Sequence, residues 1–280
     1  HRAFYVARSG RPGPVVVSLP HDMLEDLTED RTGTSLEVHK PVASRAAVQK
    51  VLNEIAKAEK PLIIAGGGVI ASKAQNELAQ FAEKLQLPVV SAFRRYNVLD
   101  NNHPHYAGWL GFGMDGQLIE SIRSSDLIVV LGSRLSQVST QDYTLLREDQ
   151  PIIQVDICES SIGKAYEVDY AVISDVKGFL EIALEEITVA SDSTVRQQFV
   201  ATCHETYLRH STPPGPTNSA YAEMNVIIKQ IAEHLPEKTV LTSDAGNFFG
   251  WVSSYIRFND QIQYVGPTSG AMGYGCPGEL

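Results

Sequence analysis

The sequence has few cysteines and no long apolar run. Its three cysteines, Cys158, Cys203 and Cys276, stand far apart with no paired spacing. Such spacing predicts a reducing compartment and argues against a disulfide framework or a zinc site, so we expect three ordinary buried thiols. No apolar stretch reaches the ~20 residues that a membrane helix needs, and no signal-peptide pattern is visible. We therefore expect a cytoplasmic protein without a membrane partner.

Positive charge is also scarce. The chain has 23 Lys and Arg against 33 Asp and Glu, which gives a net charge of −10 over 280 residues. This balance disfavours nonspecific binding to nucleic acid, so we expect no nucleic-acid partner. The hydrophobic share of 43% is ordinary for a soluble globular protein. The length suits one large domain or two ordinary ones.

Short apolar runs alternate with helical patterns along the chain. The runs predict strands, and they lie at residues 15–19, 61–65, 88–91, 126–132, 151–156, 170–173, 239–243 and 261–265. The helical patterns lie at residues 1–10, 44–55, 72–85, 117–123, 175–187, 195–210, 219–235 and 251–257. We expect Ser72 to cap the third of these helices. The stretch 93–116 has no strong period and predicts irregular structure.

This alternation predicts an α/β fold: a doubly wound, parallel-sheet central domain plus part of a second α/β domain. Changes of composition set the expected limits. Residues 1–40 end a preceding domain and include a polar linker, and residues 41–190 form the central domain. The proline cluster near 212–216 marks a linker over 191–217, and residues 218–280 begin the last domain.

Two segments of the central domain could bind a nucleotide. Gly66, Gly67 and Gly68 follow a strand and precede a helix, where free backbone N–H groups can hold a phosphate. A plain tight turn explains the same glycines equally well. Ser133 and Arg134 follow the most apolar strand, and ligands of α/β proteins bind at the carboxyl ends of strands. Arg134 could pair with a phosphate or form an ion pair with a neighbouring domain.

A third motif, Gly111 to Gly116, matches G-x-G-x-x-G letter for letter. The dinucleotide fingerprint needs a strand directly before it, and residues 105–110 do not predict one. We therefore reject an NAD-dependent dehydrogenase. The pair His103 and His105 lacks further ligands at metal-binding spacing, so no metal site is expected.

Near the end of the chain, glycines crowd one loop. Gly266, Gly270, Gly273 and Gly275 fall within the loop 266–277, which follows a predicted strand. Glycine lets a backbone turn sharply and approach a bound group closely. The segment 244–247 (Asp-Ala-Gly-Asn) also follows a predicted strand of the same unit. Together the two segments could line one site.

In combination these motifs resemble thiamine-diphosphate-dependent enzymes of the acetolactate synthase and pyruvate oxidase group. The segment 11–15 (Arg-Pro-Gly-Pro-Val) resembles the end of that family's pyrimidine-binding domain. The triple glycine, His103-Pro104, the segment 109–111 (Trp-Leu-Gly) and the segment 132–134 (Gly-Ser-Arg) resemble its central domain. The segments 244–247 and 270–275 resemble the start of its diphosphate-binding domain.

The resemblance implies a fragment of a 2-oxo acid decarboxylase or carboligase; the alternative is a non-catalytic, nucleotide-binding regulatory module. It implies thiamine diphosphate and Mg²⁺ as cofactors, a small 2-oxo acid substrate and a homodimer or homotetramer. Gly246 and Asn247 would touch the diphosphate, while Gly270, Ala271 and Met272 would meet the rings, with Met272 enforcing a bent cofactor. FAD or ADP, where bound, would contact residues Gly66, Gly67, Gly68, Trp109, Leu110, Gly111, Ser133 and Arg134.

Two motifs of that family do not occur in these 280 residues. One is the magnesium-binding Gly-Asp-Gly with its later asparagine, and the other is the glutamate that activates the pyrimidine. We therefore expect no complete catalytic set and no metal ligand in this chain. We also expect thiamine diphosphate with Mg²⁺ not to bind tightly to the chain alone.

Overall fold

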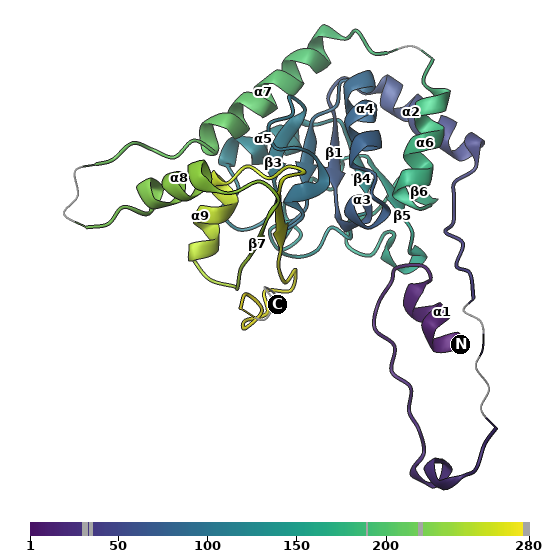
Figure 1. Cartoon of the computed structure of the whole chain (residues 1–280). Helices are drawn as coiled ribbons and strands as arrows, with labels where there is room; N and C mark the ends of the chain where they lie inside the picture. The colour runs from purple at the N-terminus through teal and green to yellow at the C-terminus, as the bar shows by residue number, and fades with distance from the viewer. Residues whose placement is uncertain (30–32, 34–35, 189, 218–220, 277–280) are drawn as a thin grey trace.

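A six-stranded parallel sheet forms the middle of the computed structural model, which describes residues 1–29, 33, 36–188, 190–217 and 221–276 (Figure 1). The strands are β1 (Pro61–Ala65), β2 (Val89–Ser91), β3 (Tyr106–Trp109), β4 (Leu127–Leu131), β5 (Ile152–Asp156) and β6 (Tyr170–Ile173). Their order is β3-β2-β1-β4-β5-β6. The chain therefore winds outward in both directions from β1, and a topological switch point lies between β1 and β4. The predicted doubly wound α/β fold is confirmed.

Helices cover both faces of this sheet. The helices α2 (Arg45–Lys57), α3 (Gly67–Ser72), α4 (Gln75–Leu85) and α6 (Val176–Glu186) pack together on one face. The helices α5 (Gly116–Ser124) and α7 (Thr194–His210) pack on the other. Successive residues of β1 explain why both faces are apolar: Ile63 joins the first core, whereas Leu62 and Ile64 join the second.

A smaller α/β unit follows α7. It contains α8 (Met224–His234), β7 (Thr239–Thr242), α9 (Phe248–Tyr255) and β8 (Ile262–Val265), and β7 and β8 pair in parallel. This unit packs on the second core through aromatic rings. The ring of Tyr96 stacks 5.1 Å from Phe258 and meets Tyr264 at 5.4 Å. The side chain of Asn101 also accepts a hydrogen bond from the Phe258 N–H, so the two units are joined by both packing and hydrogen bonds.

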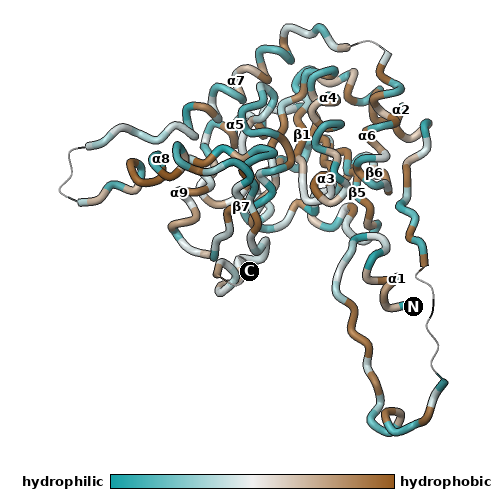
Figure 2. Tube along the Cα trace, in the orientation of Figure 1, coloured by the Kyte–Doolittle hydropathy of each residue, from teal (hydrophilic) through white to brown (hydrophobic). Residues whose placement is uncertain are grey.

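The N-terminal segment holds α1 (Arg2–Arg8) and a 3₁₀ turn, η1 (His21–Glu25). The prediction of a buried strand at residues 15–19 is wrong. This segment has no secondary structure, and Val16 is 92% exposed. Figure 2 shows the apolar stretch running along an arm that stands away from the sheet. An extended run forms a strand only beside another strand, and none lies next to it in the described chain.

Three other expectations need correction. The stretch 93–116 contains a regular strand, β3, because Tyr106–Trp109 pairs with β2. Ser72 ends α3 rather than capping α4, and its hydroxyl donates to the Gly68 carbonyl at 2.7 Å. Of the three thiols only Cys203 is buried, while Cys158 is half-buried and Cys276 exposed. Among the described residues, no helix is both long and apolar enough to span a membrane.

Candidate nucleotide and cofactor sites

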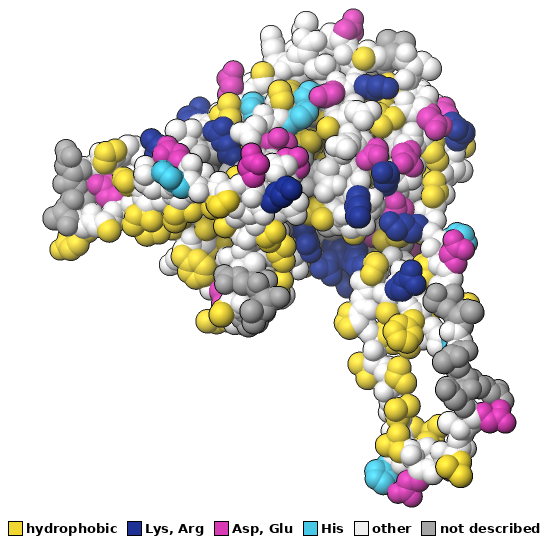
Figure 3. Space-filling view, viewed as in Figure 1, with side chains coloured by type: hydrophobic (Ala, Val, Ile, Leu, Met, Phe, Trp, Pro, Cys, Tyr) yellow, Lys and Arg dark blue, Asp and Glu magenta, His cyan; other side chains and the backbone are white. Residues whose placement is uncertain are grey.

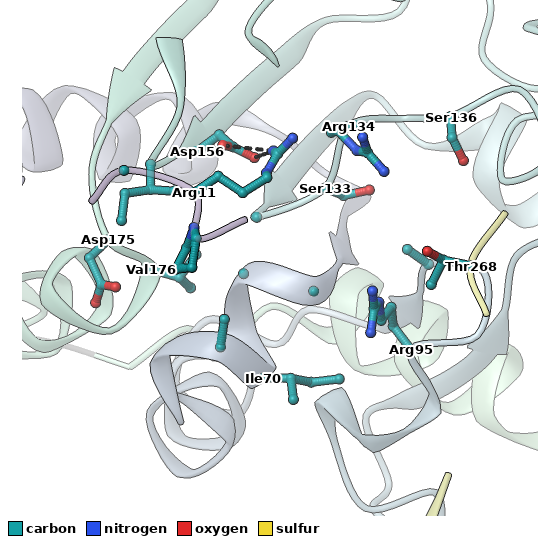
Figure 4. Close-up of a pocket in the computed structure, with 18 of the residues that line it drawn as sticks. Arg11, Ile70, Arg95, Ser133, Arg134, Ser136, Asp156, Asp175, Val176 and Thr268 are labelled. Atoms are coloured by element: carbon teal, nitrogen blue, oxygen red, sulfur yellow. Dashed lines mark hydrogen bonds and ion pairs between the residues drawn. The ribbon is translucent and has the colours of Figure 1, made fainter. Parts of the chain in front are cut away.

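A cavity of about 500 Å³ opens at the carboxyl ends of β1, β4 and β5, beside the switch point (Figure 4). Its wall includes the start of α3, the loop after β4 and the end of β5. Residues from α1, from the turn after β2 and from the start of α6 also line it, together with Lys40 and Thr268. The crevice outside the carboxyl ends of the strands at a switch point is where open α/β sheets bind ligands. The cavity is therefore the candidate ligand site of the central domain.

Glycines allow the loops after β1 and β4 to meet here. A Cβ on Gly68 would lie 2.6 Å from the Cα of Gly132, which itself has a left-handed φ of +61°. The N–H groups of Gly66 and Gly68 donate to the carbonyls of Leu131 (2.8 Å) and Gly132 (3.0 Å). The expected set of free N–H groups is therefore reduced to that of Gly67, which lines the cavity.

The charged lining divides into paired and unpaired cations. Arg11 bonds to the buried carboxylate of Asp156 at 3.2 Å, and Lys40 bonds to Asp175 at 2.7 Å. No carboxylate of the described chain lies within ion-pair distance of the other cationic lining residues, which are Arg8, Arg95 and Arg134. Figure 3 shows Lys and Arg side chains gathered below the sheet, beside the N-terminal arm.

Arg95 and Arg134 lie at the carboxyl ends of the strands, have no ion-pair partner in the described chain, and repel each other electrostatically. Burial, and then repulsion from Arg134, lowers the pKa of the half-buried Arg95 guanidinium. Figure 4 shows both side chains at one end of the cavity, near Ser133 and Thr268. Cations that repel one another and lack acidic partners favour a bound anion, and a guanidinium pairs well with phosphate oxygens.

The predicted nucleotide ligands divide into two groups. Gly67, Gly68, Ser133 and Arg134 line the cavity, and Gly66 packs against Ser133 behind it. Trp109 and Leu110 are buried in the second core and do not line the cavity. Gly111 packs against the Phe93 ring. The predicted ligands that line the cavity therefore come from the loops after β1 and β4, and not from the loop after β3.

Several lining residues were not predicted as ligands, namely Arg8, Arg11, Lys40, Arg95 and Thr268. For Arg95 a signal exists, because it follows a predicted strand just as Arg134 does. The others come from distant segments; Arg11 and its partner Asp156 are 145 residues apart. No local pattern brings such residues together.

A second candidate site lies at the carboxyl end of β7. The Tyr274 N–H donates to the Asp244 carboxylate at 2.8 Å, and the Thr242 hydroxyl donates to the Gly275 carbonyl at 3.1 Å. The segment 244–247 and the described part of the glycine loop, 266–276, therefore lie side by side; Pro277 is outside the described residues.

The strand expected to be missing before the G-x-G-x-x-G motif is present, which corrects one reason for rejecting it. The strand is β3, and it lies at the edge of the sheet, away from the switch point. A dinucleotide binds at the switch point of such a sheet. The motif is therefore not placed where a dinucleotide fingerprint would act.

The residues assigned to thiamine diphosphate surround the carboxyl end of β7. Gly246 and Asn247 directly precede α9, and their carbonyls accept hydrogen bonds from the N–H groups of Phe249 and Gly250, both at 3.1 Å. Gly270 has a left-handed φ of +72°, and the Met272 side chain is 84% exposed next to the exposed Ala271. Among the described residues no cluster of His, Cys, Asp and Glu could hold a metal ion. The glycines and the helix start fit an anionic cofactor.

Comparisons of the sequence with known proteins identify related enzymes. Residues 48–182 match the family model described as "Thiamine pyrophosphate enzyme, central domain". The chain is 32% identical over 236 residues to glyoxylate carboligase of Escherichia coli O157:H7, which covers 80% of the chain and 40% of that relative. It is 26% identical to the acetolactate synthase large subunit of Buchnera aphidicola subsp. Schlechtendalia chinensis, covering 100% of the chain and 50% of the relative.

A solved structure shares the fold. The crystal structure of benzoylformate decarboxylase from Polynucleobacter necessarius superposes with a TM-score of 0.80 at 24% identity, over 99% of this chain and 50% of that one. The chain thus spans about half the length of the relatives that it matches. Residues 48–182, with their sheet and switch point, match the thiamine pyrophosphate enzyme central domain, and the whole chain is similar in sequence to an acetolactate synthase large subunit.

Proposed function

We propose that the full-length protein containing this chain is a thiamine-diphosphate-dependent decarboxylase or carboligase acting on a small 2-oxo acid. The observation that carries the proposal is the juxtaposition of segments 244–247 and 266–276 at the end of β7, in a chain whose residues 48–182 match this family. The relatives named carboligase and synthase support an enzyme over a non-catalytic module.

The residues of this chain would bind and orient the cofactor. The backbone at Gly246 and Asn247, with the N-terminus of α9, would hold the diphosphate. The exposed Met272 side chain would support the rings from below, and the Gly270 carbonyl would accept a hydrogen bond from the pyrimidine amino group. Bound thiamine diphosphate supplies an electron sink for decarboxylation. We propose Mg²⁺ as the counterion of the diphosphate.

Release of carbon dioxide tests this proposal. Full-length protein is incubated with pyruvate, glyoxylate or benzoylformate, with and without thiamine diphosphate and Mg²⁺. We expect release from at least one acid, and only with the cofactor. Met272→Ala should lower kcat by at least about tenfold because the cofactor loses its supporting side chain. The half-exposed Met224 of α8 serves as control, and Met224→Ala should retain activity. Turnover that ignores the cofactor would refute the proposal.

We also propose that the cavity at the switch point binds a nucleotide, FAD or ADP. The unpaired Arg95 and Arg134 support an anionic ligand, and the volume of about 500 Å³ lies within the range of small-molecule sites. Absorbance at about 450 nm in the purified protein would identify a flavin. Acid-released nucleotide without that absorbance would identify ADP. We further propose that the protein is cytoplasmic and forms a homodimer or homotetramer. Light scattering measures the oligomeric state.

A further inference from the structure

The turn after β2 carries two consecutive arginines that point to different sites. Arg95 lines the cavity at the switch point. Arg94 is only 4% exposed and reaches the C-terminal unit instead. Its backbone is left-handed, with φ at +56°, a conformation that residues other than glycine rarely adopt. Such a conformation persists only where the surroundings enforce it.

The guanidinium of Arg94 joins both segments of the second site. Its Nη1 donates to the Pro267 carbonyl at 2.7 Å, and its Nη2 donates to the Asp244 carbonyl at 3.1 Å. Asp244 opens the segment 244–247, and Pro267 precedes Gly270 and Met272 in the glycine loop. One rigid, planar fork therefore sets the separation of two loops that are far apart in sequence.

The same side chain also contacts the helix that follows the first loop. The guanidinium carbon lies 4.3 Å from the centre of the Phe249 ring in α9. Within the described chain the buried Nε has no hydrogen-bond partner, so this arginine is held at a cost. An apolar side chain would fill the space without that cost, but it could not hold two carbonyls.

We propose that Arg94 is a positioning residue for the thiamine cofactor. It clamps the loop before α9 and the glycine loop at the spacing that the diphosphate and the rings require, and it anchors both to the central sheet. This inference rests on the proposed function. It predicts that loss of the guanidinium raises the Kd for the cofactor while the protein still folds.

Calorimetric titration of the full-length protein with thiamine diphosphate and Mg²⁺ tests the inference. Arg94→Gly removes the guanidinium, and glycine adopts the left-handed backbone conformation without strain. We expect its Kd to rise about 10- to 100-fold, as for loss of charge-assisted hydrogen bonds. Arg94→Lys, which retains a donor, should fall between the glycine variant and the wild type. Millimolar guanidinium should restore part of the affinity of Arg94→Gly.

Arg196 offers a matched control. It is also buried, and its guanidinium donates to the carbonyls of Leu85, Ile55 and Ala58, all remote from the cofactor loops. Arg196→Lys should lower the Tm and leave the Kd for the cofactor unchanged.

Three outcomes are decisive against the inference. A Kd within twofold of wild type in Arg94→Gly overturns it, and so does an equal loss of affinity in Arg196→Lys. A wild-type protein that does not bind thiamine diphosphate at all overturns the proposed function, and this inference with it.

Discussion

At the residue scale, the close pair Gly68 and Gly132 allows the loops after β1 and β4 to meet. A Cβ on Gly132 would lie 2.5 Å from the Gly68 Cα, and the two residues are held together by a hydrogen bond from the Gly68 N–H to the Gly132 carbonyl at 3.0 Å. Gly163 has nearly the same φ, +64° against +61°, but a Cβ added there would have nothing within 4 Å. The two left-handed glycines therefore differ in the space around them and not in backbone conformation.

This difference predicts the effect of two alanine variants. Gly163→Ala should lower the free energy of unfolding by about 1–2 kcal/mol, the cost of a left-handed alanine. Gly132→Ala should lose about 1–3 kcal/mol more, because the added methyl overpacks the contact. Urea unfolding of both variants measures the gap. Equal losses would show that the close approach of the two loops carries no strain.

How well single site residues can be predicted depends on whether they follow a strand. Arg134 is predictable because it follows the most apolar run, and Arg95 satisfies the same rule after a shorter strand. Arg11 is not, because its ion pair with Asp156 spans 145 residues. Trp109 shows the converse: it belongs to a family motif, but it is buried in the second core, and neither it nor its neighbour Leu110 lines the cavity.

At the element scale, the edge strand β3 depends on α7. The Tyr106 carbonyl accepts a hydrogen bond from His204 Nδ1 at 2.8 Å, and the Tyr207 ring meets the Tyr106 ring at 4.8 Å. These contacts explain why the sequence does not predict β3. Gly108 interrupts a four-residue run, so the strand is defined by its partners and not by its own pattern. The longer runs of β1 and β4 are predictable because their apolar residues are contiguous.

The contact between α7 and β3 predicts a large effect of one truncation. Tyr207 is 4% exposed, and Tyr207→Ala should lower the free energy of unfolding by about 3–5 kcal/mol, as for other buried aromatic residues. Val195 on the same helix is 41% exposed, and Val195→Ala should change stability by no more than about 0.5 kcal/mol. Hydrogen exchange should also accelerate at β3 in the first variant only. Unchanged exchange at β3 would contradict the dependence of this strand on α7.

At the scale of the whole molecule, the net charge of the chain is negative, whereas the lining of the switch-point cavity is rich in cations. The net charge of −10 predicts no nucleic-acid partner, yet the switch-point cavity gathers cations from the N-terminal segment and from the loops of the sheet. Composition averages over the surface, so it cannot reveal such a local concentration. The doubly wound sheet is predictable because it follows from the alternation of strands and helices. The cavity is only partly predictable, because distant segments complete it.

The most direct test of this account is calorimetric titration of ADP into full-length protein stripped of nucleotide. We predict one site, with a Kd that rises by at least about tenfold in Arg95→Met and in Arg134→Met, because each variant removes a charge-assisted phosphate contact. Arg209→Met, on α7 and outside the cavity lining, should bind like the wild type. If neither ADP nor FAD, titrated in the same way, bound to the stripped protein, or if all three variants bound with equal affinity, a nucleotide site at the switch point would be contradicted.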